Sequence, residues 1–326
     1  MPRVTVIVPV YNVESYLERC LESIMGQTYQ DFEVICINDC SPDCSQKIIE
    51  QYAEKYPDKV TALVNEKNIG LGRTRERGIR HSRGRYLMFI DSDDYIAGDY
   101  IETYVRAIEA RQCDIVIGGY TRDIDGRMAE HRVPDSEWSL LTYPIACAKM
   151  YRKDFLMENR LGFSEIRSGE DIFFSLCLFS CSPRYYVIDY AGYRYYFNRK
   201  SITGTLGYDR DFERFISQIF DEFLHWTDFL RLDEEKRRMI EYTYIANMVN
   251  ALVTYGHGGG IERMKEKYRF FLEDVQEKFP EYRSNPFYGL LKPRKQTVKI
   301  RLGVGVTMAL HRVHLDKLMF YLISLI

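Results

Sequence analysis

Three carboxylates follow directly after an apolar run in the first third of the chain. Residues 85–96 read RYLMFIDSDDYI, in which the run 86–90 is followed by Asp91, Asp93 and Asp94. Grouped carboxylates repel one another and raise one another's pKa unless a positive charge lies beside them. Two carboxylates spaced as Asp91 and Asp93 can share Mg²⁺ or Mn²⁺, which takes its other ligands from water and substrate phosphates. The pattern predicts a metal site that holds a phosphorylated substrate.

Two further residues follow the first two apolar runs of the chain. Tyr11 comes directly after VTVIVPV, where its ring could stack on a nucleobase. Asp39 ends FEVICIND, where its carboxylate could accept a hydrogen bond from a base N–H. A structural alternative is that Asp39 caps the next helix, although Ser41 or Asp43 could take that place. These positions extend the predicted phosphate site toward a nucleotide.

A second pair of acids and a basic segment complete the set of candidate residues. Glu170 and Asp171 follow a glycine in RSGEDIFF and open a predicted helix. Helix N-termini favour carboxylates, which gives the pair a structural alternative, but an ionised carboxylate can also take the proton from an attacking hydroxyl. Arg73, Arg75 and Arg77 alternate in LGRTRERGI, and we expect Arg75 to be the one that reaches a diphosphate.

The apolar runs that carry these residues alternate with helical patterns. β-branched and aromatic runs predict buried strands, and amphipathic segments between them predict helices. The predicted strands are residues 4–10, 32–37, 60–65, 86–90 and 114–120. This alternation predicts an α/β fold with a mainly parallel sheet and helices on both faces. Such sheets bind ligands at the carboxyl ends of their strands, which is where Asp39 and Asp91 fall.

The second half of the chain changes character. The patterns predict a connection over 122–143, a strand and a helix over 145–156, a helix over 170–182, and then two short strands in RYYVI and YRYYF. After about Gly207, regularly spaced aromatic and aliphatic residues predict helices up to residue 230, at 234–255 and at 261–279. We therefore predict two regions: a catalytic one over 1–206, with a donor half of about 1–120 and an acceptor half of about 121–206, and a helical one over 207–326.

The tail of the helical region is basic and apolar at once. Between Lys292 and Ile326 it carries seven lysines and arginines and the apolar stretches 302–310 and 318–326. Both stretches are far shorter than the ~20 residues that cross a bilayer. Such a segment either lies on an anionic membrane surface or packs on its own domain, and the sequence leaves both readings open.

Composition and charge exclude some classes of protein. Hydrophobic residues make up 46% and charged residues 28% of the chain, which is ordinary for a globular protein. A net charge of −2 gives no field that would attract nucleic acid. The eight cysteines lack the spacing of a zinc site, and no signal-peptide pattern precedes the first predicted strand. We expect reduced thiols in a cytoplasmic protein, at most peripheral to the inner face of the cell membrane.

Common nucleotide-binding motifs are missing from the sequence. The turn after the first predicted strand, PVYNVESYL, contains no glycine, which excludes a dinucleotide-binding fingerprint. The P-loop pattern G-x₄-G-K-[ST] is also missing. A nucleotidyltransferase would need a Gly- and Arg-rich phosphate loop after that strand, and PVYNVESYL does not supply one.

From about Val4 to Thr205 the chain resembles the family-two inverting glycosyltransferases, which have the GT-A fold. The matching pieces, in the family's order, are VTVIVPVYN, DFEVICINDCSPDCS, NIGLGRTRERGI, RGRYLMFIDSDDYI, GFSEIRSGEDIFF and YRYYFNRKSIT. The resemblance implies transfer of a sugar from a nucleotide-sugar, expected to be a UDP-sugar, to a hydroxyl of a glycan or lipid-linked acceptor. The family's commonest setting is bacterial surface-polysaccharide synthesis.

The resemblance also implies roles for the matching residues. Asp171 is the expected catalytic base with Glu170 in support, and Asp93 and Asp91 are the expected ligands of Mn²⁺ or Mg²⁺, with Asp93 the more direct one. The expected donor-binding residues are Pro9, Tyr11, Asp39, Asn68, Arg75, Asp91, Ser92 and Asp93.

Three positions depart from the family pattern. Cys40 stands where the family has the Gly of D-G-S, in a turn that glycine adopts more easily. Thr74 and Glu76 replace the Ala and Asn of A-R-N. No departure removes a group that the mechanism needs. The alternative, a catalytically inactive GT-A-like scaffold, would be expected to have lost Asp91, Asp93 or Asp171, and all three are present.

Overall fold

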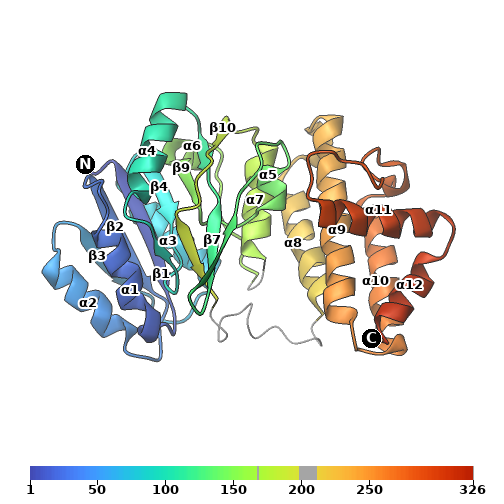
Figure 1. Ribbon diagram of the computed structural model, residues 1–326, viewed down its shortest axis with the longest axis horizontal. Coiled ribbons are helices and arrows are strands. Elements are labelled where there is room, and N and C mark those ends of the chain that lie inside the picture. Colours follow the sequence, from blue (N-terminus) through green and yellow to red (C-terminus); the bar gives the residue numbers. More distant parts are fainter. Residues whose placement is uncertain (167–168, 198–210, 326) are drawn as a thin grey trace. The chain divides into compact units, whose positions relative to one another are not determined.

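The computed structural model describes residues 1–166, 169–197 and 211–325. The chain forms two compact units, each with its own secondary structure (Figure 1). The first contains Met1–Asp135 and Pro144–Arg199, and the second contains Ser136–Tyr143 and Lys200–Ile326. The predicted boundary between residues 206 and 207 lies outside the described residues and stays a prediction. The sequence patterns did not predict that Ser136–Tyr143 belongs with the helical unit.

A seven-stranded sheet forms the centre of the first unit, in the order β10-β6-β9-β4-β1-β2-β3. Neighbouring strands are parallel except at β9, which runs antiparallel to both β4 and β6. The predicted α/β fold with a mainly parallel sheet is therefore confirmed. The strands are β1 (Val4–Val10), β2 (Phe32–Asn38), β3 (Val60–Val64), β4 (Tyr86–Phe89), β6 (Ile115–Ile117), β9 (Lys149–Arg152) and β10 (Tyr185–Val187).

The two central strands are buried along their whole length. Every residue of β1 and β2 is buried, as expected for continuous apolar runs that are covered by helices on both faces. One helix lies unusually close to the sheet, because a Cβ atom on Gly78 would come within 2.4 Å of Ile7 Cγ2. The helices of this unit are α1 (Glu14–Met25), α2 (Ser45–Lys55), α3 (Leu71–His81), α4 (Tyr100–Arg111), α6 (Lys153–Glu158) and α7 (Glu170–Ser180).

A second, four-stranded sheet adjoins the carboxylate segment in the order β5-β11-β7-β8. The prediction of a simple connection over 122–143 was wrong, because β7 and β8 form a hairpin there. Asp125 and Gly126 both have positive φ, and the Gly126 N–H donates to Asp123 Oδ1. An Asp-Gly pair flanked by strand residues is a sequence signal for such a turn. The strands are β5 (Tyr95–Ile96), β7 (Tyr120–Ile124), β8 (Arg127–His131) and β11 (Tyr193–Tyr196).

The second unit is helical, as predicted. Its longest helix, α9, packs against α5, α8, α10, α11 and α12. Trp138, from the segment Ser136–Tyr143, is buried and packs edge-on against Tyr242 and Phe287. The helices are α5 (Ser139–Thr142), α8 (Phe212–Trp226), α9 (Glu234–Gly256), α10 (Ile261–Lys278), α11 (Val298–Arg312) and α12 (Asp316–Ile323), with short 3₁₀ turns η1 (Phe229–Arg231) and η2 (Tyr282–Ser284).

Candidate active site

The carboxyl ends of β1, β2 and β4 lie at one edge of the main sheet. The strands are parallel and in register, with Val10 paired to Asn38 and Ile7 paired to Phe89. Tyr11, Asp39 and Asp91 follow these strand ends, so the backbone carries all three to the same edge, as the sequence predicts.

The three acids that follow β4 have different environments. Asp94 is buried, where its Oδ1 accepts from the backbone N–H of Tyr196 at 2.8 Å and its Oδ2 accepts from the Tyr193 hydroxyl at 2.5 Å. The same hydroxyl accepts from the Asp91 N–H at 3.2 Å. Burial raises the pKa of Asp94 well above its ordinary value, and the charges of Asp93 and Asp91 raise it further. Asp94 therefore ties the carboxylate segment to β11.

Arg75 provides the positive charge that the acids require. Its guanidinium donates from Nη2 to Asp91 Oδ1 and from Nη1 to Asp171 Oδ1, both at 2.7 Å. Nη1 also lies 3.6 Å from Glu170 Oε1. The Arg75 side chain is only 1% exposed, whereas those of Asp91, Asp171 and Glu170 are 33%, 24% and 13% exposed. One buried guanidinium therefore joins the acid after β4 to both acids at the start of α7.

The contacts that Arg75 makes in the structure are not the ones that the sequence led us to expect. Its charge is directed at protein carboxylates, and the predicted contact with a diphosphate stays a prediction. Its neighbours on α3 point elsewhere, since Arg73 pairs with Glu165, and Arg77 donates to Asn65 Oδ1. Glu76, one of the departures from the family pattern, accepts from the Phe163 N–H at 3.1 Å.

Burial raises the pKa of both acids at the start of α7. For Glu170 burial and the charge of Asp171 raise the pKa to about 7, with Arg75 opposing the shift. For Asp171 burial raises the pKa, and Arg75 and a hydrogen bond from the Ala146 N–H oppose the shift. The pKa of a general base that works near neutral pH should lie close to the operating pH. The direction of both shifts therefore suits proton transfer.

Two residues beside this cluster were missed by the sequence analysis. Lys149, at the start of β9, is buried and donates from Nζ to the Ile145 carbonyl. Burial lowers its pKa to about 8, while the charge of Asp171 acts to raise it. Cys147, two residues before Lys149, is also buried, and burial together with the charge of Asp91 raises the pKa of its thiol. The signal was a lysine inside the apolar run IACAKMY, where a charge is unusual.

Asp39 lies at the end of β2 and holds the loop that precedes α3. Its Oδ1 accepts from the side chain of Asn65 and the N–H of Ile69, both at 2.8 Å, and its Oδ2 accepts from the Gly70 N–H at 2.9 Å. It does not cap α2, whose N-cap residue is Cys44, and the Ser45 N–H donates to Asp43 Oδ1. Its predicted contact with a nucleobase is a separate function of the same carboxylate and stays a prediction.

The remaining predicted donor-binding residues vary in accessibility. Pro9 is buried within β1, and Ser92 is buried between the two acids that flank it. Tyr11 and Asn68 are exposed, as residues that stack on or bind a nucleotide must be. Cys40 adopts a φ of +58°, so the turn has the left-handed conformation that favours glycine.

The residues present fit a metal ion that shares its ligands with a substrate. Among the residues that the structure describes, no three or more His, Cys, Asp or Glu side chains are grouped to hold a metal. The predicted ligands are thus the two carboxylates of Asp91 and Asp93, which suits Mg²⁺ or Mn²⁺ completed by water and phosphate oxygens. Arg75 donates to Oδ1 of Asp91 but not to Oδ2, and the Asp91 side chain is 33% exposed. A metal ion could therefore reach the second oxygen of Asp91.

Sequence comparisons show that much of this site lies in a segment that matches a known family. Residues 5–164 match the model of Glycosyl transferase family 2. Glycosyltransferase GlyA of Streptococcus pneumoniae is 36% identical over 51% of this chain and 23% of its own length. EpsJ of Bacillus subtilis, an uncharacterized glycosyltransferase, is 33% identical over 62% of this chain and 63% of its own length. The chain thus spans less than two thirds of either relative.

Two further similar proteins have names that state which sugar they transfer. The poly(ribitol-phosphate) beta-N-acetylglucosaminyltransferase TarS of Staphylococcus aureus is 29% identical over 60% of this chain and 35% of its own length. A structure of TarS 1–349 with UDP-GlcNAc aligns with a TM-score of 0.70 over 96% of this chain and 92% of that one, at 23% identity. The mannosyltransferase PcManGT of Pyrobaculum calidifontis, with GDP-Man and Mn²⁺, aligns with a TM-score of 0.56 over 95% of this chain and 88% of its own, at 17% identity.

These comparisons agree with the predicted fold. The structural neighbours align with nearly the whole chain, and their agreement with the α/β fold of the first unit and the helical region after it confirms the predicted fold class. The family match covers β1 to the segment just before α7, and so includes the carboxylates that follow β4. The chain therefore resembles the family 2 glycosyltransferases over residues 5–164, and the fold of its first unit is GT-A.

Proposed function

We propose that the protein transfers a sugar from a nucleotide-sugar, most simply a UDP-sugar, to an acceptor hydroxyl with inversion of configuration. The observation that carries the proposal is the bridge made by Arg75 between Asp91 and Asp171. It joins an acid of the metal-binding pattern to the acid suited to take a proton. A donor held by the first acid would present its reacting carbon to an acceptor beside the second.

The proposed reaction is a single in-line displacement. Asp171 takes the proton from the acceptor hydroxyl, whose oxygen forms a bond to the anomeric carbon as the bond to the nucleotide diphosphate breaks. Attack from the face opposite the leaving group inverts the configuration. Arg75 and the Ala146 N–H fix the Asp171 carboxylate in one orientation. A divalent cation held by Asp93 and Asp91 would neutralise charge on the departing diphosphate.

The nucleotide is proposed to lie along the carboxyl edge of the sheet. Tyr11 would stack on the base, and Asp39 would accept from a base N–H through the one lone pair of Oδ2 that the loop before α3 leaves unused. Arg75 lies too deep in the cluster to be the main diphosphate contact, so we assign that part to Asn68 and the metal.

The acceptor is proposed to be a glycan or a lipid-linked glycan of a bacterial surface polymer. TarS is named for transfer to poly(ribitol-phosphate), and its match covers 60% of this chain. Such a function places the protein in the cytoplasm or at the inner face of the membrane, where nucleotide-sugars are made and used.

The first experiment is a measurement of nucleoside diphosphate release from a panel of sugar nucleotides, with and without Mn²⁺. Wild type is compared with Asp93→Ala and with the control Asp58→Asn, which changes an exposed acid away from the site. Metal-dependent release from one or two donors, lost only in Asp93→Ala, would support the proposal and name the sugar. Release of pyrophosphate instead would indicate a nucleotidyltransferase. If no sugar nucleotide released a diphosphate and UDP with Mn²⁺ failed to raise the melting temperature, the proposed donor site would be wrong and a scaffold function would be favoured.

A further inference from the structure

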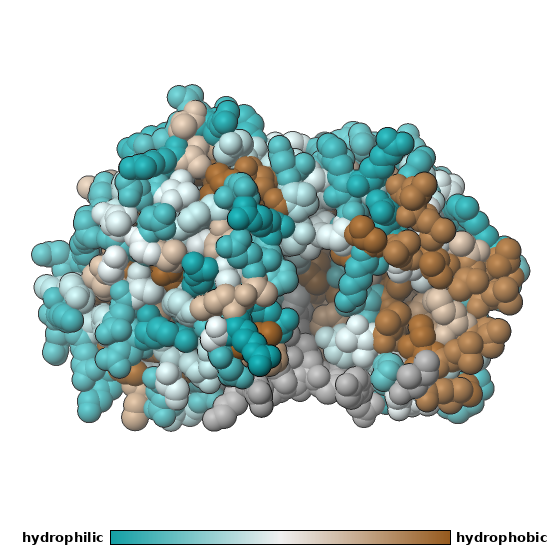
Figure 2. Space-filling model, viewed as in Figure 1, coloured by the Kyte–Doolittle hydropathy of each residue, from teal (hydrophilic) through white to brown (hydrophobic). Residues whose placement is uncertain are grey.

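The end of the helical unit is rich in exposed apolar residues. Of the nineteen large hydrophobic residues that are exposed in the described structure, ten fall within residues 290–325. Exposed apolar residues scattered singly need no explanation, but a contiguous group usually marks an interaction surface. Figure 2 shows a hydrophobic patch in the region of α11 and α12.

The exposed residues have helical spacing. Val298, Leu302 and Val306 lie at intervals of four on α11. Leu318 and Leu322 lie four apart on α12, and Leu315 directly precedes that helix. We call these six residues the apolar face. The opposite sides of the same helices are buried in the unit, with Met308 and Phe320 among the buried residues. Both helices are therefore apolar on the core side and on the outer side.

The exposed charged side chains of residues 290–325 are all positive. Residues 290–325 contain seven lysines and arginines and a single acid, Asp316. Asp316 is 2% exposed and accepts from the Tyr268 hydroxyl at 2.6 Å, with His311 Nδ1 at 2.7 Å from the same oxygen. The acid is thus buried in the fold, and the exposed charges of the segment are all positive.

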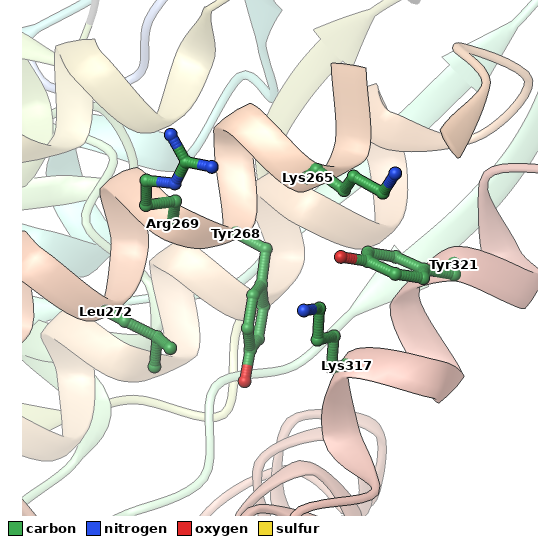
Figure 3. Close-up of a pocket in the computed structure, with 6 residues that line it drawn as sticks. All are labelled: Lys265, Tyr268, Arg269, Leu272, Lys317 and Tyr321. Carbon is green, nitrogen blue, oxygen red and sulfur yellow. The ribbon is translucent and has the colours of Figure 1, made fainter. Parts of the chain in front are cut away.

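A cleft lined by cations lies beside the apolar face. It has a volume of about 200 Å³ and is lined by Lys265, Tyr268, Arg269 and Leu272 of α10 and by Lys317 and Tyr321 of α12 (Figure 3). Lys317 and Tyr321 each directly precede a leucine of the apolar face. A second cleft in this unit is also basic, with Arg283 and Arg312 in its lining. Cationic clefts next to apolar residues suit a molecule with an anionic head and an apolar body.

We infer that this surface docks on an anionic lipid bilayer, with the apolar face in the boundary between head groups and acyl chains. Helices with an exposed apolar side and flanking lysines and arginines bind membranes in this way, and the cationic cleft fits a lipid phosphate. Among the described residues no helix is long and apolar enough to cross a bilayer, so this contact is interfacial. The inference stands apart from the proposed transferase chemistry.

Two other occupants fit the surface less well. A second copy of the chain would bring the same seven positive charges against themselves across a twofold interface, which is unfavourable. A dissolved anionic polymer would use the cations, but it would not explain the row of leucines and valines. The bilayer alone matches both the charge and the apolar residues.

The test is co-sedimentation of the full chain with vesicles of phosphatidylcholine, with and without phosphatidylglycerol. We expect wild type to pellet with the anionic vesicles and to stay in solution with the neutral ones. Leu318→Glu/Leu322→Glu and Lys265→Gln/Lys317→Gln should each weaken binding by at least about tenfold. The matched controls are Leu230→Glu and Arg231→Gln, which alter residues of η1 that are 78% and 87% exposed and lie outside the surface.

Three results would overturn the inference. The first is equal binding to neutral and anionic vesicles, or binding to neither. The second is loss of binding in the lysine variant while the leucine variant binds as well as wild type, which would indicate a polyanion site. The third is a dimer in size-exclusion chromatography that Leu318→Glu/Leu322→Glu dissociates while vesicles have no effect on wild type. Melting temperatures of all variants confirm folding, and UDP binding reports separately on the donor site.

Discussion

Each unit of the molecule contains a buried cation paired with carboxylates, and the two clusters are built differently. In the first unit Arg75 faces Asp91, Glu170 and Asp171, all of which remain partly exposed. In the second unit Lys267 binds both carboxylate oxygens of Glu213, at 2.8 and 3.0 Å, and both side chains are only 2% exposed.

The difference lies in the balance of charge. Lys267 and Glu213 are closed to water, and the further contact of Lys267 with Asp211 Oδ1 is longer, at 3.5 Å, so this cluster mainly joins helices. Three carboxylates around one guanidinium leave an excess of negative charge that is open to solvent. Such a cluster can bind a cation or accept a proton, which makes it a candidate site on electrostatic grounds.

Asp171→Asn should have the largest effect, because it removes the proposed base and nearly preserves its shape. We expect the rate of transfer to fall by about 10²- to 10⁴-fold while nucleotide binding persists. Transfer is measured as nucleoside diphosphate release, and binding as the rise in melting temperature with UDP and Mn²⁺. Equal loss of both would contradict the assignment.

Breaking the closed pair should affect stability alone. Lys267→Met leaves Glu213 buried without its partner, which costs about 3–5 kcal/mol. The double variant Lys267→Met/Glu213→Leu should recover most of this loss, since apolar residues can replace a buried pair. Urea denaturation measures the effect, and the affinity for UDP should not change. Failure of the double variant to recover stability would mean that the pair has a further role.

Glu170→Gln tests the excess of negative charge through its effect on the pH dependence of the free energy of unfolding. Its pKa in the folded protein is raised to about 7, so between about pH 4.5 and 7 the folded state binds more protons than the unfolded state. Stability therefore falls as pH rises through this window. Removing the charge should stabilise the metal-free protein at pH 8 by on the order of 1–3 kcal/mol, with little effect at pH 4.5. Urea midpoints across this range, with EDTA present, would contradict the prediction if the two proteins had parallel profiles.

The smallest effect is expected at the turn beside the nucleotide edge. Cys40 has a left-handed backbone conformation, and Cys40→Gly should stabilise the fold by up to about 1 kcal/mol. Cys44→Gly is the matched control, because Cys44 is also exposed but has an ordinary φ of −82°. A gain at both positions, or at neither, would rule out backbone strain as the cause. Thermal denaturation in reducing buffer measures the difference.

Much of the fold could be predicted because it depends on local patterns. The continuous apolar runs determine β1, β2 and β4, and parallel alternation carries Tyr11, Asp39 and Asp91 to one edge. The hairpin of β7 and β8 was missed although Asp125 and Gly126 signalled it, because the surrounding polar residues made the segment resemble a loop.

The sequence by itself determined which acids occur and which strand ends carry them, since strand periodicity and residue type act over a few residues. Only the tertiary structure decided their partners. Arg75 and Asp171 are 96 residues apart, and Tyr193 and Asp94 are 99 apart. Whether an acid is tied to a tyrosine, bridged by an arginine or left open to solvent depends on packing between distant segments. The same limit applies to α11 and α12, whose sequence left membrane binding and self-packing open, and whose structure shows one side buried and the other exposed.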